Sequence, residues 1–188
     1  MAVDSFTYFG PAAGERGRGW YSYDIGAWHL IARNSNCARV GGCGPGSAQE
    51  RWLRADLAAH PNRCTLAYWH HARFSSGGHG SYPAYDGFWR ALYAAGADVV
   101  LSAHDHDYER FAPQNPDARP DKARGIRQFV VGTGGKNLHR FGQVEPNSEV
   151  RRSGFGVLLL TLHARGYEWR FVPEAGGGTP DAGSGSCH

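Results

Sequence analysis

Apolar residues occur along the chain in short runs, and segments rich in glycine, serine or proline separate these runs. A short run with β-branched and aromatic residues, bounded by turn-forming residues, is typical of a β-strand. Strands are therefore predicted over residues 20–33 (two strands broken at Gly26), 64–69, 97–102, 126–132, 155–163 and 167–172.

Two other segments place their apolar residues on one face of a helix. Ser47 and Glu50 form a capping box, which predicts that a helix begins there. Residues 84–95 form the second predicted helix. This order, strand and helix alternating before a run of strands, predicts a single mixed α/β domain over residues 1–188. Its last part, residues 174–188, is rich in glycine and serine and is predicted to be an irregular tail.

Composition narrows the class of protein. Of the 188 residues, 41% are hydrophobic and 20% are charged, which is enough apolar material for a core and excludes a disordered segment. The net charge of +3 is small and spread along the chain, so it indicates no specific nucleic-acid partner. No apolar run has membrane-spanning length, and the opening MAVDSFTYFG lacks the basic and apolar parts of a signal peptide.

The chain contains four cysteines, which suggest two disulfides. Cys37 and Cys43 flank a glycine-containing loop, and a Cys64–Cys187 bond would join the last part of the chain to the strand that begins near Cys64. Two plausible pairs favour an oxidising compartment, extracellular or periplasmic. The alternative is four free thiols, and a zinc knuckle is disfavoured because the chain has no Cys-x-x-Cys pair.

Two predicted strands end in histidines, one in His70 and His71 and the other in His104 and His106. If these strands are parallel neighbours, their carboxyl ends meet at one edge of the sheet, where open α/β sheets place their functional sites. A single histidine is more often an ordinary surface or core residue. Two pairs at two strand ends predict a transition-metal site, with zinc, iron or manganese as the ion and copper or nickel as further options.

Residues 65–74, TLAYWHHARF, with residues 75–80, SSGGHG, resemble a late motif of the calcineurin-like metallophosphoesterases. Residues 99–110, VVLSAHDHDYER, resemble the final motif of that family, Gly-His-x-His followed by x-Tyr-Glu-Arg. With residues 129–135, FVVGTGG, they are most similar to the purple-acid-phosphatase-like branch, and the resemblance runs from Tyr8 onward. It implies a metallophosphoesterase-like β-sandwich flanked by helices, present as a truncated half that contributes one of the two sheets.

The resemblance also implies roles for individual residues. His70 and His104 would bind one metal of a dinuclear pair, and His106 would bind the other. His79 falls at the position of a histidine that contacts the substrate phosphate and protonates the leaving group. His71 falls where the family varies, so it would be a neighbour able to act as general acid or base.

We also expect roles for three charged residues near these motifs. Arg73 is a candidate for holding an anionic substrate, with an ordinary surface charge as the alternative. Glu109 and Arg110 would fix the last loop by a salt bridge between them. The family motifs that supply a bridging carboxylate are absent from this sequence, and Asp105 would point away from the metal.

Three histidines with an open position still describe a mononuclear site that can activate water. The expected function is therefore metal-dependent hydrolysis of a small phosphomonoester or phosphodiester. Two alternatives stay open: other hydrolytic or redox chemistry (copper or iron) on the same histidines, and a metal-binding remnant without catalysis. A bare inner sheet face would attract a second copy of the chain, so a homo-oligomer is expected.

Overall fold

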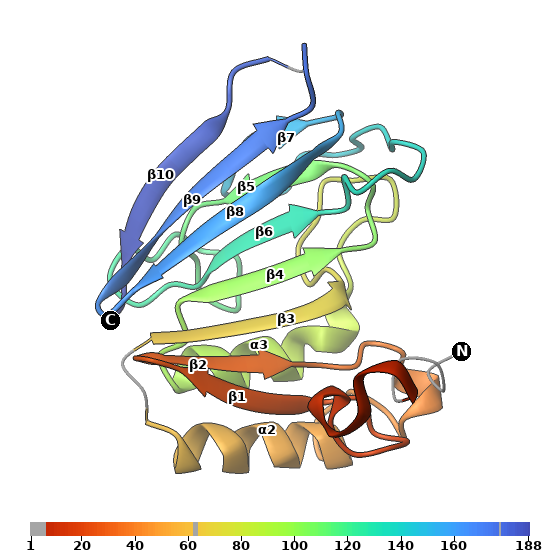
Figure 1. Cartoon of the computed structure of the whole chain (residues 1–188), viewed down its shortest axis with the longest axis vertical. Coiled ribbons are helices and arrows are strands. Elements are labelled where there is room, and N and C mark those ends of the chain that lie inside the picture. Colours follow the sequence, from red (N-terminus) through yellow and green to blue (C-terminus); the bar gives the residue numbers. More distant parts are fainter. Residues whose placement is uncertain (1–6, 62–63, 177) are drawn as a thin grey trace.

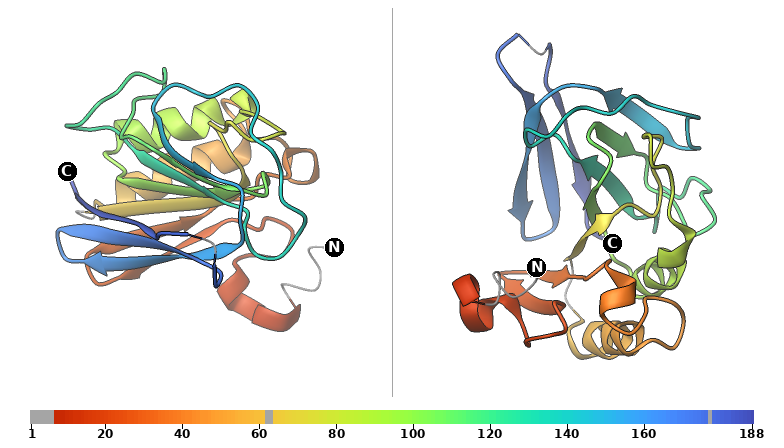
Figure 2. Two further views of the ribbon diagram at one scale, coloured as in Figure 1. Left: turned by 90° about the horizontal axis from the view of Figure 1, so that it is seen from above. Right: turned by 90° about the vertical axis from the view of Figure 1, so that its right-hand side faces the viewer.

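The structure, a computed structural model, describes residues 7–61, 64–176 and 178–188. Two β-sheets lie face to face, and two α-helices cover the outer face of the larger sheet (Figure 1; Figure 2, left). The larger sheet has seven strands in the order β1-β2-β3-β4-β6-β5-β7, and the smaller has three in the order β10-β9-β8. The predicted mixed α/β class is thereby confirmed. The signal-peptide prediction concerned MAVDSFTYFG, whose first six residues lie outside the described part.

The elements of the described residues, with η for short 3-10 helices, are η1 (Gly10–Ala13), β1 (Tyr21–Ile25), β2 (Trp28–Ala32), η2 (Cys37–Arg39), α2 (Ala48–Ala59), β3 (Cys64–His71), η3 (Pro83–Tyr85), α3 (Asp86–Ala94), β4 (Val99–Ala103), β5 (Tyr108–Phe111), β6 (Arg127–Val131), β7 (Ser148–Arg152), β8 (Gly156–His163), β9 (Gly166–Pro173) and β10 (Asp181–Ser186). Every strand and helix predicted from the hydrophobic pattern is present. The strands β5, β7 and β10 were not predicted.

The irregular tail predicted over residues 174–188 is wrong, because β10 pairs antiparallel with β9 along its whole length. Its glycines make this possible. A Cβ atom at Gly183 would lie 2.4 Å from the Trp169 ring, and one at Gly185 would lie 2.5 Å from the Tyr167 ring. The aromatic rings of β9 therefore lie across the bare backbone of β10, a packing that the hydrophobic pattern of the tail does not reveal.

Four strands at the centre of the larger sheet are parallel neighbours, β2 with β3, β3 with β4, and β4 with β6. The helix α2 connects β2 to β3, and α3 connects β3 to β4. These crossovers bring the carboxyl ends of the four strands to one edge of the sheet, at the right of Figure 1.

The expectation that this chain contributes only one sheet of the sandwich is also wrong. The strands β8, β9 and β10 pack on the inner face of the larger sheet, where Trp169 and Phe171 contact a core that includes Phe129. The cover is partial, since a hollow beside Leu158 and Leu160 remains between the sheets. On the opposite face of the edge strand β8, Val157 is 58% and Leu159 is 55% exposed. A second apolar core lies between the larger sheet and the two helices.

Both suggested cysteine pairs form disulfides, Cys37–Cys43 and Cys64–Cys187. The second bond joins the first residue of β3, in the larger sheet, to the residue that follows β10, in the smaller sheet. It therefore ties the two layers of the sandwich together. None of the helices in the described residues combines the length and the apolar character of a membrane-spanning segment.

A buried histidine holds the first hairpin against α2. The His29 side chain is 1% exposed, with its Nδ1 2.7 Å from an Asp24 oxygen and its Nε2 2.9 Å from an Asp56 oxygen. Burial by itself lowers the pKa of His29, but the hydrogen bonds and charges of Asp56 and Asp24 together raise it above its ordinary value of 6.5. Burial by itself raises the pKa of Asp56, but hydrogen bonds from His29 and Ser22 lower it below 3.8.

These two shifts predict a limited pH range in which the His29–Asp56 pair stabilises the fold. The lowered pKa of Asp56 gives stability that is lost as the pH falls through its folded-state value. The raised pKa of His29 gives stability that is complete below 6.5 and lost as the pH rises through its folded-state value. Replacement of His29 by alanine leaves the buried Asp56 carboxylate without its charged partner. We therefore expect the free energy of unfolding to fall by about 3 kcal/mol near pH 6.

Urea denaturation of the wild type and of His29→Ala at about pH 6 and about pH 9 measures this effect, and the loss should be smaller at the higher pH. His163→Ala, at an exposed position of β8, is the matched control and should have little effect. An equal loss in His29→Ala at both pH values would contradict the ion pair.

Candidate metal centre

The strand ends place three histidines in contact. His70 and His71 are the last residues of β3, and His104 directly follows β4. His104 Nδ1 lies 2.9 Å from His70 Nε2, and the rings of His71 and His104 are 4.3 Å apart between centroids. One nitrogen from each of the three rings lies within 4.8 Å of the others. The structure therefore brings the first predicted ligand pair together and adds His71 to it.

Two backbone irregularities aim these rings at one another. The pairing of β3 with β4 shifts register between Tyr68 and His71, as in a β-bulge. His104 has a φ of 68°, in the left-handed region that side-chain-bearing residues seldom adopt. Strain of this kind is concentrated at functional sites, where the surrounding structure enforces it.

A buried carboxylate positions the loop that carries His79. Asp105 is 1% exposed; its oxygens accept hydrogen bonds from the His79 amide, at 2.7 Å, and from the Ser75 hydroxyl, at 2.6 Å. A Cβ atom at Gly77 would lie 2.3 Å from Asp105 Cγ, so only glycine allows this approach. The His79 ring lies 4.2 Å from the His104 ring as a result.

The expected salt bridge between Glu109 and Arg110 does not form. Glu109 is buried and accepts hydrogen bonds from the amide and hydroxyl of Ser76 and from the hydroxyl of Ser148. Arg110 instead pairs with Asp181 of β10, at 2.8 Å. Adjacent strand residues point to opposite faces of a sheet, so Glu109 supports the histidine loop while Arg110 binds the second sheet.

His106 lies beside the three-histidine group with different partners. Its Nδ1 donates to the carbonyl oxygen of Asn137 at 2.6 Å, and its ring stacks on His139 with centroids 4.1 Å apart. His139 Nδ1 accepts the His106 amide at 3.2 Å. His79, Asp105 and His139 form a separate group whose potential ligand atoms lie within 4.8 Å of one another.

Sequence reasoning missed His139, although a signal was available. It lies in the loop after β6, and β6 runs parallel to β4, so its following loop reaches the same edge of the sheet. The rule that located His70 and His104 finds His139 only when it is extended from the strand ends to the loops that follow them.

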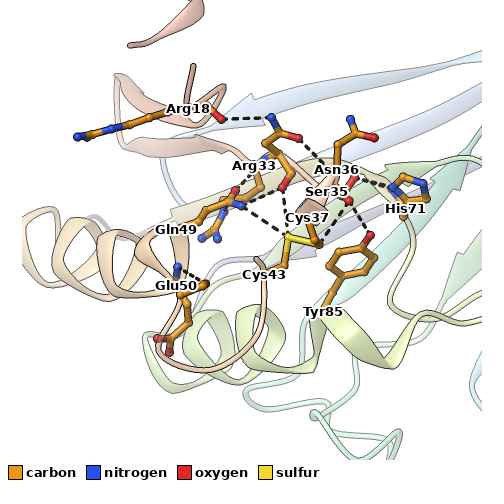
Figure 3. The surroundings of a disulfide bond; sticks show 12 residues. Arg18, Arg33, Ser35, Asn36, Cys37, Cys43, Gln49, Glu50, His71 and Tyr85 are labelled. Atoms are coloured by element: carbon orange, nitrogen blue, oxygen red, sulfur yellow. Dashed lines mark hydrogen bonds between the residues drawn. A yellow bond between two sulfur atoms is a disulfide. The ribbon is translucent and has the colours of Figure 1, made fainter. Parts of the chain in front are cut away.

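The Cys37–Cys43 loop supports the site from the side (Figure 3). Ser35, next to this loop, places its hydroxyl 2.8 Å from His71 Nδ1, and the same hydroxyl accepts the His71 amide. The Ser35 carbonyl oxygen accepts a hydrogen bond from Tyr85 at 2.8 Å. His71 is thereby fixed by a residue directly beside the loop that the disulfide closes.

Arg73 has partners away from the histidines. Its guanidinium donates to Asp86, at the start of α3, at 3.2 Å and lies over the Phe74 ring at 4.3 Å. The side chain is 15% exposed, so Arg73 is a structural charge rather than the ordinary surface charge of the alternative expectation. Its contact with a substrate anion stays a prediction.

The histidines at the centre are held as neutral rings. Burial is the main cause that lowers the pKa values of His70 and His71. Burial, with the neighbouring His71, His79 and His70, lowers the pKa of His104 to about 4. A neutral imidazole has a free nitrogen lone pair, which is the form that binds a metal.

Asp107 is a buried acid directly beside this group. It is fully buried, and neither of its oxygens has a hydrogen-bond partner within the described residues. Burial, followed by the charges of Asp105 and Glu109, raises the pKa of Asp107 to about 8, so the carboxyl group is mostly protonated at neutral pH. It does not supply a bridging carboxylate in this form.

Two hollows adjoin His70. One of about 650 Å³ opens between the sheets, with Leu101 on one side and Leu158 and Leu160 on the other. The second, of about 400 Å³, lies toward Asn36 and the first residues of the described chain. A small molecule therefore has access to His70 from either side.

Comparisons with known proteins agree with this geometry. The chain is 32% identical over 148 residues to purple acid phosphatase 21 of Arabidopsis thaliana, and 30% identical over 153 residues to purple acid phosphatase 22 of the same plant. Each match covers 73% of this chain, which spans about a third (32%) of the length of either relative. No protein-family model matches the chain.

The fold is that of a solved purple acid phosphatase, PPD1 from yellow lupin (Lupinus luteus) seeds, with a TM-score of 0.79. The sequences are 20% identical, and the match covers 93% of this chain and 34% of that chain. The helix-flanked sandwich with histidines at parallel strand ends is thus a metallophosphoesterase fold. The chain belongs to the calcineurin-like metallophosphoesterases, in their purple-acid-phosphatase-like branch.

The left-handed backbone at His104 predicts that replacing this residue by glycine lowers the affinity for metal without lowering the thermal stability. Glycine adopts this conformation without the steric cost of about 1 kcal/mol, so His104→Gly should melt no lower than the wild type when both are metal-free. Its affinity for Zn²⁺ should fall at least tenfold, because one ring of the group is lost.

Thermal melting and titration calorimetry with Zn²⁺ measure the two quantities. Ser102→Gly, on the regular part of β4, is the control and should lower the melting temperature. A His104→Gly variant that is destabilised as much as Ser102→Gly would show that the His104 backbone is not strained.

Proposed function

We propose that the chain is the metal-binding part of a metal-dependent phosphoester hydrolase that acts on a small phosphomonoester or phosphodiester. The observation that carries the proposal is the meeting of His70, His71 and His104 at one sheet edge, with His79 and His106 next to them. The similarity to purple acid phosphatases supports the reaction class.

The donor set fits a transition metal. Three neutral imidazoles in contact suit zinc, iron, copper or nickel better than magnesium or calcium, which prefer oxygen ligands. We assign His70 and His104 to one ion and His106 to a second or to an outer position. When bound, such an ion lowers the pKa of a water ligand and polarises a phosphoryl oxygen.

The remaining residues position the substrate and move its proton. The exposed ring of His79 stands beside His104 on a loop held by Asp105, where a ring nitrogen is able to donate a proton to a leaving-group oxygen. His71, fixed by Ser35, is the second candidate for this role. The 650 Å³ hollow would receive the organic part of the ester.

Hydrolysis of p-nitrophenyl phosphate and bis(p-nitrophenyl) phosphate tests this function. We expect metal-dependent turnover in the wild type and at least a hundredfold loss in His70→Ala and His104→Ala, because each removes one ligand. A loss of the same size in His106→Ala is expected if His106 binds the second ion. His163→Ala, an exposed histidine on β8, should retain the activity of the wild type.

Metal content is measured on the same samples. A wild type that binds metal stoichiometrically and hydrolyses neither ester would overturn the catalytic proposal and favour a non-catalytic metal-binding role. Turnover that survives in His104→Ala would place the reaction elsewhere.

We further propose that a second copy of the chain covers the exposed edge strand β8 of the smaller sheet. The strand β8, GVLLLTLH, has apolar side chains on both faces and no lysine, arginine, aspartate or glutamate. It is nevertheless an edge strand, although edges are normally protected by charge. Two β8 strands paired about a twofold axis would cover each other's edge, beside which the hollow at Leu158 opens. On the outer face, the exposed Val157 and Leu159 side chains of the two copies would pack next to one another across the pairing.

Light scattering coupled to gel filtration measures the mass in solution. We expect a dimer for the wild type and a monomer for Leu159→Lys, which places a charge in the proposed interface at an exposed position that the fold tolerates. A wild type that stays monomeric at high micromolar concentration would contradict the dimer and would leave the edge to another polypeptide.

The two disulfides suit an extracellular or periplasmic site of action, which we propose for the oxidised protein.

A further inference from the structure

A second group of metal-ligating side chains lies at the opposite edge of the larger sheet. Cys64 begins β3, whose other end carries the histidines, and an eight-residue strand spans roughly 25 Å. Cys64, Asp98 and Cys187 each offer one ligand atom, and these atoms lie within 4.8 Å of one another. Nδ1 of His188 lies 3.1 Å from an Asp98 carboxylate oxygen.

The four residues come from both layers of the sandwich. Cys64 begins β3 and Asp98 directly precedes β4, so both belong to the larger sheet. Cys187 and His188 follow β10 of the smaller sheet, and the Cys187 amide donates to the Arg165 carbonyl in the turn between β8 and β9. Any bond or ion shared by the four therefore joins the two sheets (Figure 1, left side).

Asp98 is the unusual member of the group. Its side chain is 1% exposed, and its oxygens accept hydrogen bonds from the Thr65 amide at 2.8 Å and the His188 amide at 3.1 Å. Burial, against the opposing effect of these amides and of the His188 ring, raises the pKa of Asp98 to about 6. A buried carboxylate is costly unless a cation compensates it, and the His188 ring, when protonated, does so in part. A metal ion would do so fully once the two sulfurs beside Asp98 are reduced to thiolates.

We propose that, when the Cys64–Cys187 disulfide is reduced, Cys64, Asp98, Cys187 and His188 bind one Zn²⁺, so that the two sheets stay joined in either redox state. Two thiolates, one imidazole and one carboxylate complete the four-coordinate shell of structural zinc. The distance of 3.1 Å between His188 Nδ1 and an Asp98 carboxylate oxygen is close to the separation of about 3.4 Å expected for two donor atoms on one tetrahedral zinc ion.

A dithiol supplies the electrons and protons that reduction of the Cys64–Cys187 disulfide requires. The dithiol gives two electrons and two protons to the Sγ–Sγ bond of Cys64 and Cys187, which breaks to two thiols, and the reductant closes to its own disulfide. As Zn²⁺ binds, the two thiols release their protons to solvent and two zinc–sulfur bonds form. Reoxidation would reverse these steps and release the ion.

The other disulfide provides an internal control. Cys37 and Cys43 neighbour Gln49 and the Asn34 carbonyl oxygen, and within the described residues they belong to no group of metal-ligating side chains. Reduction there creates two thiols without an imidazole or carboxylate beside them.

Cobalt, a spectroscopic substitute for zinc, tests the proposal. The full chain is reduced with a dithiol, desalted without oxygen and titrated with Co²⁺. We expect a thiolate-to-cobalt charge-transfer absorption, its displacement by Zn²⁺, and no such absorption in the oxidised protein. In His70→Ala/His104→Ala, which lacks the first metal centre, it should saturate at one equivalent. Histidines produce no thiolate absorption, so the reading is independent of the first metal centre and of any hydrolytic activity.

Variants assign the ligands. Cys187→Ser should abolish the absorption, and His188→Ala and Asp98→Asn should weaken Co²⁺ binding at least tenfold. The Cys37→Ser/Cys43→Ser and His70→Ala/His104→Ala variants should keep it. Absence of the absorption in the reduced wild type would overturn the proposal, as would its persistence in Cys187→Ser. Unfolding of the reduced chain that Zn²⁺ fails to reverse would overturn it as well.

Discussion

Parallel pairing of β3 with β4 is the constraint on which the metal centre depends. The crossover through α3 sets both strands in the same direction, so His70, His71 and His104 arrive at one edge although a long segment of chain separates them. The register shift near the end of β3 and the left-handed backbone of His104 then turn the rings toward one another. The parallel topology determines the edge, and these two local distortions determine the direction of the side chains.

Buried acids hold the surrounding loops in place. Asp105 accepts hydrogen bonds from the His79 loop, and Glu109 accepts hydrogen bonds from Ser76 in the same loop. A Cβ atom at Gly132 would lie 1.9 Å from the Asp105 carbonyl oxygen, so the backbone after β6 also packs directly against this segment. In this chain, Asp105 and Glu109 thus position the loops around the histidines by hydrogen bonds, and Asp105 also belongs to the group of potential ligand atoms with His79 and His139.

The hydrophobic pattern was sufficient for most strands and for both helices of the core, because their periodicity and length reflect burial. It missed the short core strand β5, whose four residues include the charged Glu109 and Arg110. It failed for β10, whose strand depends on glycines that receive the rings of Trp169 and Tyr167 from a neighbouring strand. Strand ends located His70 and His104, but His139 lies in the loop after β6 and not at the strand end, so that rule did not reach it. The Glu109–Arg110 pairing was wrong because adjacent strand residues face opposite ways, which the alternation of a strand already implies.

The position of a bound metal tests the central claim most directly. Anomalous diffraction from crystals of the chain soaked in Zn²⁺ locates the ion without reference to activity. The account predicts a peak within about 2.1 Å of ring nitrogens of both His70 and His104, at the carboxyl ends of β3 and β4. Full zinc occupancy elsewhere, with these two rings unliganded, would contradict it.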